Sequence, residues 1–251
     1  MAESRQTGKT AVVIGSTGLV GAHLVRRLLD DDRYRQVISL ARRETGSKHP
    51  KLRTLVLDFE RMAETGTIEE LEKLAREGEA PEDWFCALGT TIRVAGSQQA
   101  FRRVDYDYPL AFGRLAKKLG AERVLLVTAI GSSAESKVFY SRVKGELERD
   151  LAALGLPELA IFQPSLLMGE RQEFRLVEKI AAVVMPALAP VLSGPLRKYR
   201  AVRGDDVAAA MVAVANGSSQ GLAHAQGKAL TPSPVRRVAN DEIQRLAKRS
   251  T

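Results

Sequence analysis

The chain has 251 residues and a formal net charge of +8 at pH 7, with 45% apolar and 27% charged residues. This composition is typical of a soluble globular protein and excludes a disordered or fibrous chain. The positive charge alone is compatible with a nucleic acid, with an anionic small molecule, or with solubility only.

Short apolar segments alternate with segments of helical spacing from the N-terminus to residue 165. The predicted strands cover 10–15, 36–42, 52–59, 84–90, 123–132 and 158–165, and the predicted helices cover 19–30, 68–78, 108–120 and 141–155. Near-continuous apolar strands that alternate with helices are typical of a parallel sheet covered on both faces. We therefore predict an α/β fold of the Rossmann-like type, with a doubly wound parallel sheet.

No composition shift divides this pattern into two domains. We predict a single Rossmann domain over 1–217, with a small substrate-side segment around 166–203, and a C-terminal extension over 218–251. The basic end of the extension is interpreted as a solvated tail, in which NDEIQRLAKR could form a short helix. The apolar run at 180–192 contains two prolines and is too short to span a bilayer, so we predict a core helix and no membrane partner.

The content of cysteine and histidine bears on location and on metals. The only cysteine, Cys86, cannot form an intramolecular disulfide, so we predict a reducing, cytoplasmic location. The N-terminal residues contain no apolar stretch longer than AVVI, so no signal peptide is expected. The three histidines are scattered and lack the spacing of metal ligands, so no metal site is expected.

The first predicted strand is followed by GSTGLVGAH, which contains three glycines at a strand-to-helix junction. A turn without side chains lets the backbone approach a pyrophosphate, and the helix N-terminus offers N–H donors and the positive end of a dipole. The pattern predicts a dinucleotide phosphate site formed by Gly15, Ser16, Thr17, Gly18, Leu19, Val20 and Gly21. The alternative is a tight turn with close helix packing and no ligand.

Two arginines, Arg42 and Arg43, follow the second predicted strand. An acidic residue here would bind the ribose 2′-hydroxyl of NAD, whereas arginine suits the 2′-phosphate of NADP. We therefore predict NADP(H) in preference to NAD(H), the alternative being surface arginines without a ligand. Asp58 and Phe59 end the third predicted strand and are candidate cofactor-binding residues. Asp58 could accept from the adenine amino group, or it could cap the following turn.

Tyr140 and Lys144 are four residues apart in VFYSRVKGELE, a predicted helix, and therefore share one helix face. A phenol in water has a pKa of about 10. A neighbouring ammonium group favours the phenolate, so such a tyrosine can exchange a proton nearer neutral pH. The pair is a candidate acid/base couple, and Lys144 could also hold the nicotinamide ribose. The alternative is an exposed tyrosine stacked along a lysine side chain.

The motifs VIGSTGLVG, CALGTT, VDYDY, YSRVKGELE and GER together resemble the short-chain dehydrogenase/reductase superfamily. More narrowly, they are similar to its atypical branch around the mammalian Tat-interacting oxidoreductase. The resemblance covers roughly residues 10–215. It implies a Rossmann fold that binds NADP(H), with Tyr140 as the catalytic acid/base and Lys144 as its partner.

Two positions depart from the pattern of that superfamily. Thr128 stands where a catalytic serine is usual, with Ser132 and Ser133 slightly later. Asp105 stands where an asparagine is usual. The resemblance therefore implies that Thr128, or one of the two serines, orients the substrate oxygen.

The resemblance also implies residues that line the cofactor and the substrate. The implied cofactor-lining residues are Leu88, Gly89, Thr90, Thr91, Asp105, Gln163, Pro164 and Ser165. Arg171 is a candidate for binding an anionic substrate, the alternative being an ion pair with Glu170 or Glu173 on the surface.

These observations predict an oxidoreductase that transfers a hydride between NADP(H) and a small carbonyl or alcohol substrate. The alternative is a regulatory protein of the same fold that senses NADP(H) with little or no turnover. Nucleic acid is not expected, because no recognition motif accompanies the positive charge. A homodimer or a protein partner is left open.

Overall fold

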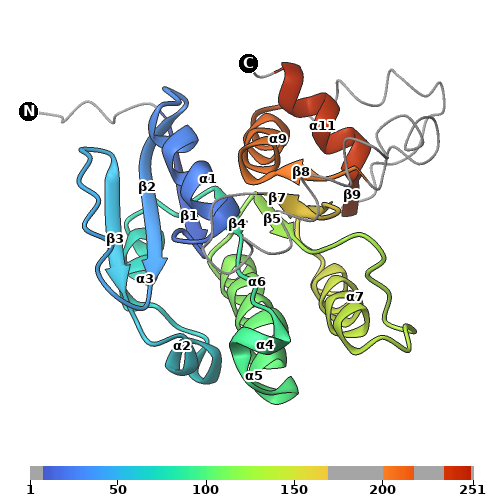
Figure 1. Cartoon of the computed structure of the whole chain (residues 1–251). Coiled ribbons are helices and arrows are strands. Elements are labelled where there is room, and N and C mark those ends of the chain that lie inside the picture. Colours follow the sequence, from blue (N-terminus) through green and yellow to red (C-terminus); the bar gives the residue numbers. More distant parts are fainter. Residues whose placement is uncertain (1–7, 169–199, 218–234, 250–251) are drawn as a thin grey trace, which may run out of the picture.

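The computed structural model describes residues 8–168, 200–217 and 235–249 of the chain (Figure 1). In these ranges, seven parallel strands form one sheet in the order β3-β2-β1-β4-β5-β6-β9. Its strands are β1 (Lys9–Ile14), β2 (Tyr34–Ala41), β3 (Leu52–Val56), β4 (Asp83–Cys86), β5 (Arg123–Val127), β6 (Glu158–Gln163) and β9 (Val235–Ala239). A separate parallel pair is formed by β7 (Leu167–Met168) and β8 (Val202–Arg203).

Helices cover both faces of this sheet. One face is covered by α1 (Leu19–Leu29), α9 (Gly204–Asn216) and α11 (Asn240–Arg249). The other is covered by α2 (Phe59–Thr65), α3 (Glu69–Arg76), α6 (Tyr108–Lys118) and α7 (Phe139–Ala152). Three short helical segments precede α6, namely α4 (Ile92–Ala95), α5 (Gln98–Arg102) and the π-helix η1 (Arg103–Asp107).

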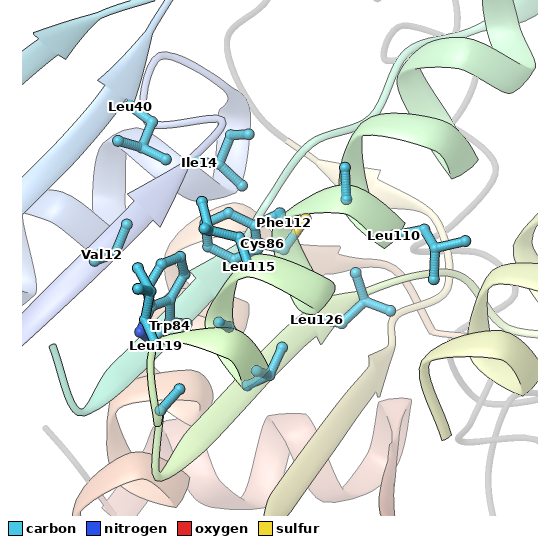
Figure 2. Close-up of a cluster of buried hydrophobic side chains, with 14 of the residues drawn as sticks. Val12, Ile14, Leu40, Trp84, Cys86, Leu110, Phe112, Leu115, Leu119 and Leu126 are labelled. Atoms are coloured by element: carbon cyan, nitrogen blue, oxygen red, sulfur yellow. The ribbon is translucent and has the colours of Figure 1, made fainter. Parts of the chain in front are cut away.

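The core consists of two apolar layers, because successive side chains of a strand point to opposite faces of the sheet. In β1, Val12 and Ile14 belong to the layer under α6, whereas Ala11 and Val13 belong to the layer under α1. Figure 2 shows part of the first layer, with side chains of α6 facing those of the strands. The predicted α/β fold, a Rossmann-like doubly wound sheet, is confirmed.

The order of the strands reverses at β1, whose neighbours are β2 and β4. In an open α/β sheet, ligands bind in the crevice outside the carboxyl ends of the strands at such a switch point. The glycine turn after β1 and the segment after β4 both open on this crevice. Most of the predicted site residues therefore lie at the carboxyl ends of the strands although they are far apart in the sequence.

A network of charged side chains around a buried aspartate lies at the amino ends of the strands, opposite the crevice. Asp83, at the start of β4, is fully buried. It accepts hydrogen bonds from the Tyr34 hydroxyl at 2.8 Å, the Lys9 ammonium at 3.1 Å and the Arg123 guanidinium at 2.9 Å. Arg123 also donates to Glu158 at 2.9 Å. Each buried charge in this network thus has a partner of opposite sign.

Strand β5 is shorter than predicted and ends at Val127 rather than at residue 132. Beyond Val127 the chain leaves the sheet, and Gly131 adopts a φ of 76°, which an extended strand does not accommodate. The loop that follows passes close to α7 at Gly145. A Cβ atom on this residue would lie 2.1 Å from the backbone carbon of Ser133. The sequence did not place this exit, because Ala129 and Ile130 continue the apolar run after the strand has ended.

The interpretation of the basic C-terminus as a solvated tail is wrong for residues 235–249. Residues Val235–Ala239 pair in parallel with β6 as the last strand of the sheet. The short helix at 240–249 is present as α11, and Ile243 on it is buried in the core under α1 and α9. Arg236 and Arg237 have acidic partners, Glu242 and Glu148, so charge did not exclude a strand here.

No helix within the described ranges is both long and apolar enough to cross a bilayer. The apolar run at 180–192 and Arg171 lie outside the described residues.

Candidate cofactor and active site

The turn between β1 and α1 is built on glycines for steric reasons. Gly15 has a φ of 85°, and a Cβ atom there would lie 2.6 Å from the backbone of Ala87. A Cβ atom on Gly21 would lie 2.0 Å from the carbonyl oxygen of Gly15. The same carbonyl accepts a hydrogen bond from the Gly18 N–H at 2.9 Å. These contacts keep the turn tight and its outer surface free of side chains.

The N-terminus of α1 has no capping side chain and no acidic residue in its first turn. Its first N–H groups and the positive end of the helix dipole are therefore available to an anion. Gly18, Leu19 and Val20 line a cavity of about 380 Å³, called here the catalytic cavity. Gly15, Ser16 and Thr17 line a second cavity of about 370 Å³, called here the nucleotide cavity.

The nucleotide cavity also contains the two arginines of the sequence prediction. Arg42 and Arg43 line it together with Phe59 and Leu88. Both arginines are exposed, and within the described ranges neither has an ion pair or a hydrogen bond from its side chain. Asp58 does not line this cavity. Its carboxylate caps α2 by accepting from the Glu60 N–H at 2.8 Å, so the capping alternative is the one observed.

The catalytic cavity contains the predicted acid/base couple. Tyr140 and Lys144, one turn apart near the start of α7, both line it. The Tyr140 ring packs against Phe101 of α5, with ring centroids 5.6 Å apart. Tyr140 is partly exposed, whereas Lys144 is almost fully buried. The phenol therefore faces the cavity with its ring supported from behind.

Asp105 holds Lys144 from the π-helix η1. Its Oδ1 lies 2.8 Å from Lys144 Nζ, and its Oδ2 accepts from the Thr90 N–H at 2.9 Å. Both charged side chains are buried. Burial opposes the charge on Lys144, but the Asp105 carboxylate and the Tyr140 phenol outweigh that effect and raise the lysine pKa. The lysine is therefore an ammonium ion throughout the neutral range.

Cys86 lies beneath this pair at the end of β4. Burial raises the pKa of its thiol to about 11, although the charge of Lys144 opposes that shift. A buried thiol that stays protonated is a poor nucleophile. Cys86 is thus part of the packed floor of the site.

Thr128 lines the catalytic cavity, but its hydroxyl group points into a buried network. Its Oγ1 donates to Glu148 at 2.7 Å, and Gln163 donates to both oxygens of Glu148 at 2.9 and 3.1 Å. Arg237 of β9 donates to Glu148 at 3.3 Å. The single proton of the Thr128 hydroxyl is therefore engaged, and the amide of Gln163 is engaged in the same way.

The two serines considered as alternatives to Thr128 do not line the catalytic cavity. Ser132 donates to the Ala129 carbonyl at 2.7 Å, and Ser133 donates to Glu135 at 2.8 Å. Pro164 and Ser165 do line it. The Ser165 hydroxyl donates to the carbonyl of Arg200.

The remaining predicted residues after β4 line the same cavity. These are Leu88, Gly89, Thr90 and Thr91. Thr91 also caps α4 by accepting from the Val94 N–H at 3.2 Å. The segment after β4 therefore forms one wall of the catalytic cavity, and the Thr90 N–H fixes that wall to Asp105.

The sequence prediction missed three kinds of residue at this site. Val94, Leu166 and Leu167 line the catalytic cavity but carry no polar signal. Glu148 supports the cavity from below, and its spacing of four residues from Lys144 on α7 could have indicated it. Asn240 of α11 fixes the loop after β6, because its side chain accepts from the Ser165 N–H at 3.1 Å. That contact joins residues too far apart in the chain for any local pattern.

Among the described residues, no group of three or more His, Cys, Asp or Glu side chains is arranged to hold a metal ion.

Comparison with known proteins agrees with this geometry. Residues 11–136 match the NAD dependent epimerase/dehydratase family. The chain belongs to that family. Protein FMP52, mitochondrial, of Debaryomyces hansenii is 30% identical over 95% of this chain and 98% of its own length. The protein of the same name in Coccidioides immitis is 31% identical over 95% of this chain and 96% of its own length.

Solved structures share the fold at low sequence identity. An oxidoreductase of the short-chain dehydrogenase/reductase family from Burkholderia thailandensis has a TM-score of 0.62 and 18% identity, over 94% of this chain and 93% of that one. MoeE5 in complex with UDP-glucose and NAD has a TM-score of 0.61 and 16% identity, over 96% of this chain and 82% of that one. The epimerase/dehydratase and short-chain dehydrogenase folds are thus both represented among its structural neighbours.

The predicted cytoplasmic location is contradicted by the relatives, which are named mitochondrial proteins. The prediction rested on the single cysteine. A chain with one cysteine forms no intramolecular disulfide in any compartment, so this count could not separate the cytoplasm from a mitochondrion.

Proposed function

We propose that the chain is an NADP(H)-dependent oxidoreductase that transfers a hydride between the nicotinamide and a carbonyl or alcohol carbon. One observation carries the proposal. The uncapped N-terminus of α1, the Tyr140 phenol and the buried Lys144 ammonium all meet at the catalytic cavity. A site for phosphate and a site for proton transfer are therefore joined by one cavity.

The residues present fit a pyridine dinucleotide. The glycine turn presents a surface without side chains, and its tight form depends on Gly21, where a Cβ atom would lie 2.0 Å from the Gly15 carbonyl oxygen. Lys144 has one described anionic partner, Asp105, and its ammonium also borders the cavity, where its other N–H donors suit ribose hydroxyls. When bound, the cofactor supplies or accepts the hydride.

The proton is assigned to Tyr140. In the reducing direction, the Tyr140 hydroxyl donates its proton to the oxygen of the substrate carbonyl as the hydride reaches the carbon. The Lys144 ammonium stabilises the phenolate that remains, and Asp105 fixes the position of Lys144. In the oxidising direction, the phenolate takes the proton back from the alcohol. The role of Thr128 in orienting the substrate oxygen stays a prediction, because its proton is engaged with Glu148.

NADP(H) is proposed over NAD(H) because of Arg42 and Arg43. The matched family is described as NAD dependent, and NAD is present in the MoeE5 structure. In this chain, however, two arginines without described partners line the nucleotide cavity just after β2. This position faces the ribose 2′ substituent in folds of this type, and a guanidinium group suits a phosphate there.

Purified protein tests the proposal with a matched pair of tyrosine variants. Tyr140→Phe should lower kcat for carbonyl reduction by about 10²–10⁴-fold, because it removes only the acid group. NADPH affinity, measured by fluorescence titration, should be unchanged. Tyr106→Phe is the control, because Tyr106 donates to Asp150 outside the cavity at 2.6 Å. Full turnover by Tyr140→Phe would show that another group supplies the proton.

A second candidate function is favoured by the state of Thr128. With its hydroxyl donating to Glu148, the described part of the site offers no serine or threonine at the end of β5 with a free proton for the substrate oxygen. A regulatory protein that senses NADP(H) would need the binding site but not this donor. NADPH binding without oxidation of NADPH by any of a broad set of carbonyl compounds would support it. The narrower resemblance to the branch around the mammalian Tat-interacting oxidoreductase remains a prediction. It bears on the choice between an enzyme and a regulatory protein.

A further inference from the structure

The exposed apolar side chains of the described residues are concentrated around the catalytic cavity. Large apolar residues that are strongly exposed occur at six positions in these ranges, Val56, Ile92, Val94, Val138, Leu166 and Met168. Val56 lies on the edge strand β3. The other five belong to three segments that also contribute residues to the cavity, and Val94 and Leu166 line it directly. Such a concentration of exposed apolar surface marks a binding site more often than chance exposure does.

The three segments approach the cavity from different parts of the chain. Ile92 and Val94 lie on α4, next to the wall formed by Thr90 and Thr91. Val138 precedes α7, two residues before Tyr140. Leu166 and Met168 flank Leu167, which lines the cavity from β7. The catalytic phenol is therefore bordered by apolar side chains on more than one side.

Charge within the cavity is already balanced. Its described lining contains two charged side chains, Asp105 and Lys144, which neutralise each other at 2.8 Å. No described lining residue offers an unpaired charge to a substrate, and burying an unpaired charge of the substrate here would be costly. Leu166, at 42% exposure, and Val94, at 54%, would instead lose water when an apolar group covers them.

We propose that the substrate is an apolar carbonyl compound, one that carries an alkyl or aryl group and no charge, and this inference rests on the proposed function. The alkyl or aryl group lies against Val94 and Leu166, and the carbonyl group reaches Tyr140. In the reaction, the carbonyl carbon gains the hydride that NADPH supplies, and the carbonyl oxygen gains the proton of Tyr140. The C=O double bond becomes a C–OH single bond, NADPH becomes NADP⁺, and the phenolate regains a proton from water.

The inference separates this chain from the proteins that share its fold. The structures of MoeE5 and of a UDP-glucose 4-epimerase from Thermotoga maritima contain UDP-glucose. A nucleotide sugar carries two phosphate charges and many hydroxyl groups, which require charged and polar partners. The described lining of this cavity provides an apolar border in their place.

Two matched series of aldehydes test the inference with the full-length protein and NADPH. The first series is propanal through nonanal, and the second carries a terminal carboxylate on the same chain lengths. We expect kcat/KM in the first series to rise by up to about fourfold for each methylene group that becomes buried. The carboxylates should be poorer substrates at every length. A flat first series, or a preference for the carboxylates, would overturn the inference and leave the proposed oxidoreductase function intact.

Variants locate the effect on the apolar border. Val94→Asn with Leu166→Asn should raise the ratio of KM for nonanal to KM for propanal at least tenfold, because only the long chain needs the apolar border. Val56→Asn is the matched control, because Val56 is 48% exposed but lies away from the cavity. An equal effect of the control on nonanal would place the apolar site elsewhere and overturn the assignment to these residues.

A binding measurement distinguishes failure of this inference from failure of the proposed function. Calorimetric titration with the unreactive amides of the two series, with and without NADPH, reports occupancy independently of turnover. Binding of the long apolar amides without reduction of any aldehyde would sustain the apolar site and refute the oxidoreductase function. Absence of binding by the apolar amides, or tighter binding of the carboxylates, would refute the apolar site.

Discussion

Two buried aspartates lie at opposite ends of the strands, one where the strands begin and one beyond their carboxyl ends. They differ in whether their cationic partners have hydrogen-bond donors left for a ligand. Asp83, where β4 begins, and Asp105, beyond the end of β4, are both fully buried next to a cation. Both oxygens of Asp83 accept hydrogen bonds, from the Tyr34 hydroxyl, the Lys9 ammonium and the Arg123 guanidinium. This network is closed, and it bonds neighbouring strands to one another.

Lys144, the partner of Asp105, has N–H donors that are not engaged by described residues. Lys144 lies beside the Asp105 carboxylate and also borders the catalytic cavity. The two aspartates are equally buried, but Asp83 pairs with two cations and Asp105 with one, and only the cation beside Asp105 borders the cavity. A closed network contributes to stability, whereas an ammonium held in place with donors to spare is suited to binding and catalysis.

The largest expected effect is on stability, at the closed network. Asp83→Asn should lower the free energy of unfolding by about 3 kcal/mol, because it removes the buried carboxylate that pairs with both Lys9 and Arg123. Denaturant titration measures this change. Glu77→Gln removes a carboxylate from an exposed pair with Lys73 and should cost less than about 1 kcal/mol. Equal losses in the two variants would mean that the buried network contributes no more than a surface pair.

The next effect is on cofactor binding, at the glycine turn. Gly21→Ala places a methyl group where the Gly15 carbonyl oxygen lies, so the turn must open. We expect the affinity for NADPH to fall by about 100-fold, which corresponds to about 2.7 kcal/mol. Gly66→Ala controls for a general loss of stability, because the φ of 63° at Gly66 strains an alanine and Gly66 lines neither cavity. Retention of NADPH affinity in Gly21→Ala would exclude the turn as the phosphate site.

The fold could be predicted because its signals are local and repeated. Apolar runs such as that of Val12 to Ile14, followed by a glycine turn and an amphipathic helix, specify strand, turn and helix without reference to the rest of the chain. The last strand could not be predicted, because Val235–Ala239 has two arginines in its centre. It becomes a strand only because β6 offers it an unpaired edge and Glu148 offers a partner to Arg237.

The site was predictable to the extent that residue type alone carries its chemistry. Tyr140 and Lys144 could be found from their spacing, whereas Asp105 was indicated only by the resemblance to the superfamily and its contact with Lys144 was not predicted. The direction of a hydroxyl group could not be found. Thr128 is at the predicted place, but its hydroxyl group donates to the buried Glu148, and that contact depends on how α7 packs against β5.

A smaller effect on stability is expected when Lys144 loses the negative charge of Asp105. Asp105→Asn should lower the free energy of unfolding at neutral pH by about 2 kcal/mol, less than the loss for Asp83, because it removes one ion pair whereas the change at Asp83 removes two. In the native protein the pKa of Lys144 is raised above its usual value of 10.5. Stability from the Lys144 charge is therefore present from neutral pH up to about pH 10.5 and is lost as the pH rises through the raised value.

The native protein and Asp105→Asn should consequently converge in stability above about pH 10.5. Denaturant titration of both proteins across the alkaline range measures the convergence. A difference in stability that stays constant through this range would show that the ion pair with Lys144 does not cause it.

The smallest expected effect concerns the preference of the nucleotide cavity for NADPH over NADH. Arg42→Ala combined with Arg43→Ala should weaken NADPH binding about tenfold, because two exposed guanidinium groups are lost from the side of the nucleotide cavity that would hold a 2′-phosphate. NADH lacks this phosphate, so its affinity should hardly change, and the ratio of the two affinities is the quantity to measure.

Arg93→Ala removes an exposed arginine on α4 that does not line the nucleotide cavity, so it controls for the general loss of positive charge. If Arg93→Ala weakens NADPH binding as much as the double variant does, the arginines act only through net charge. If the double variant loses as much affinity for NADH as for NADPH, Arg42 and Arg43 contact a group that both cofactors share. Only a change in the ratio assigns them to the 2′-phosphate, and it would do so without any substrate having been identified.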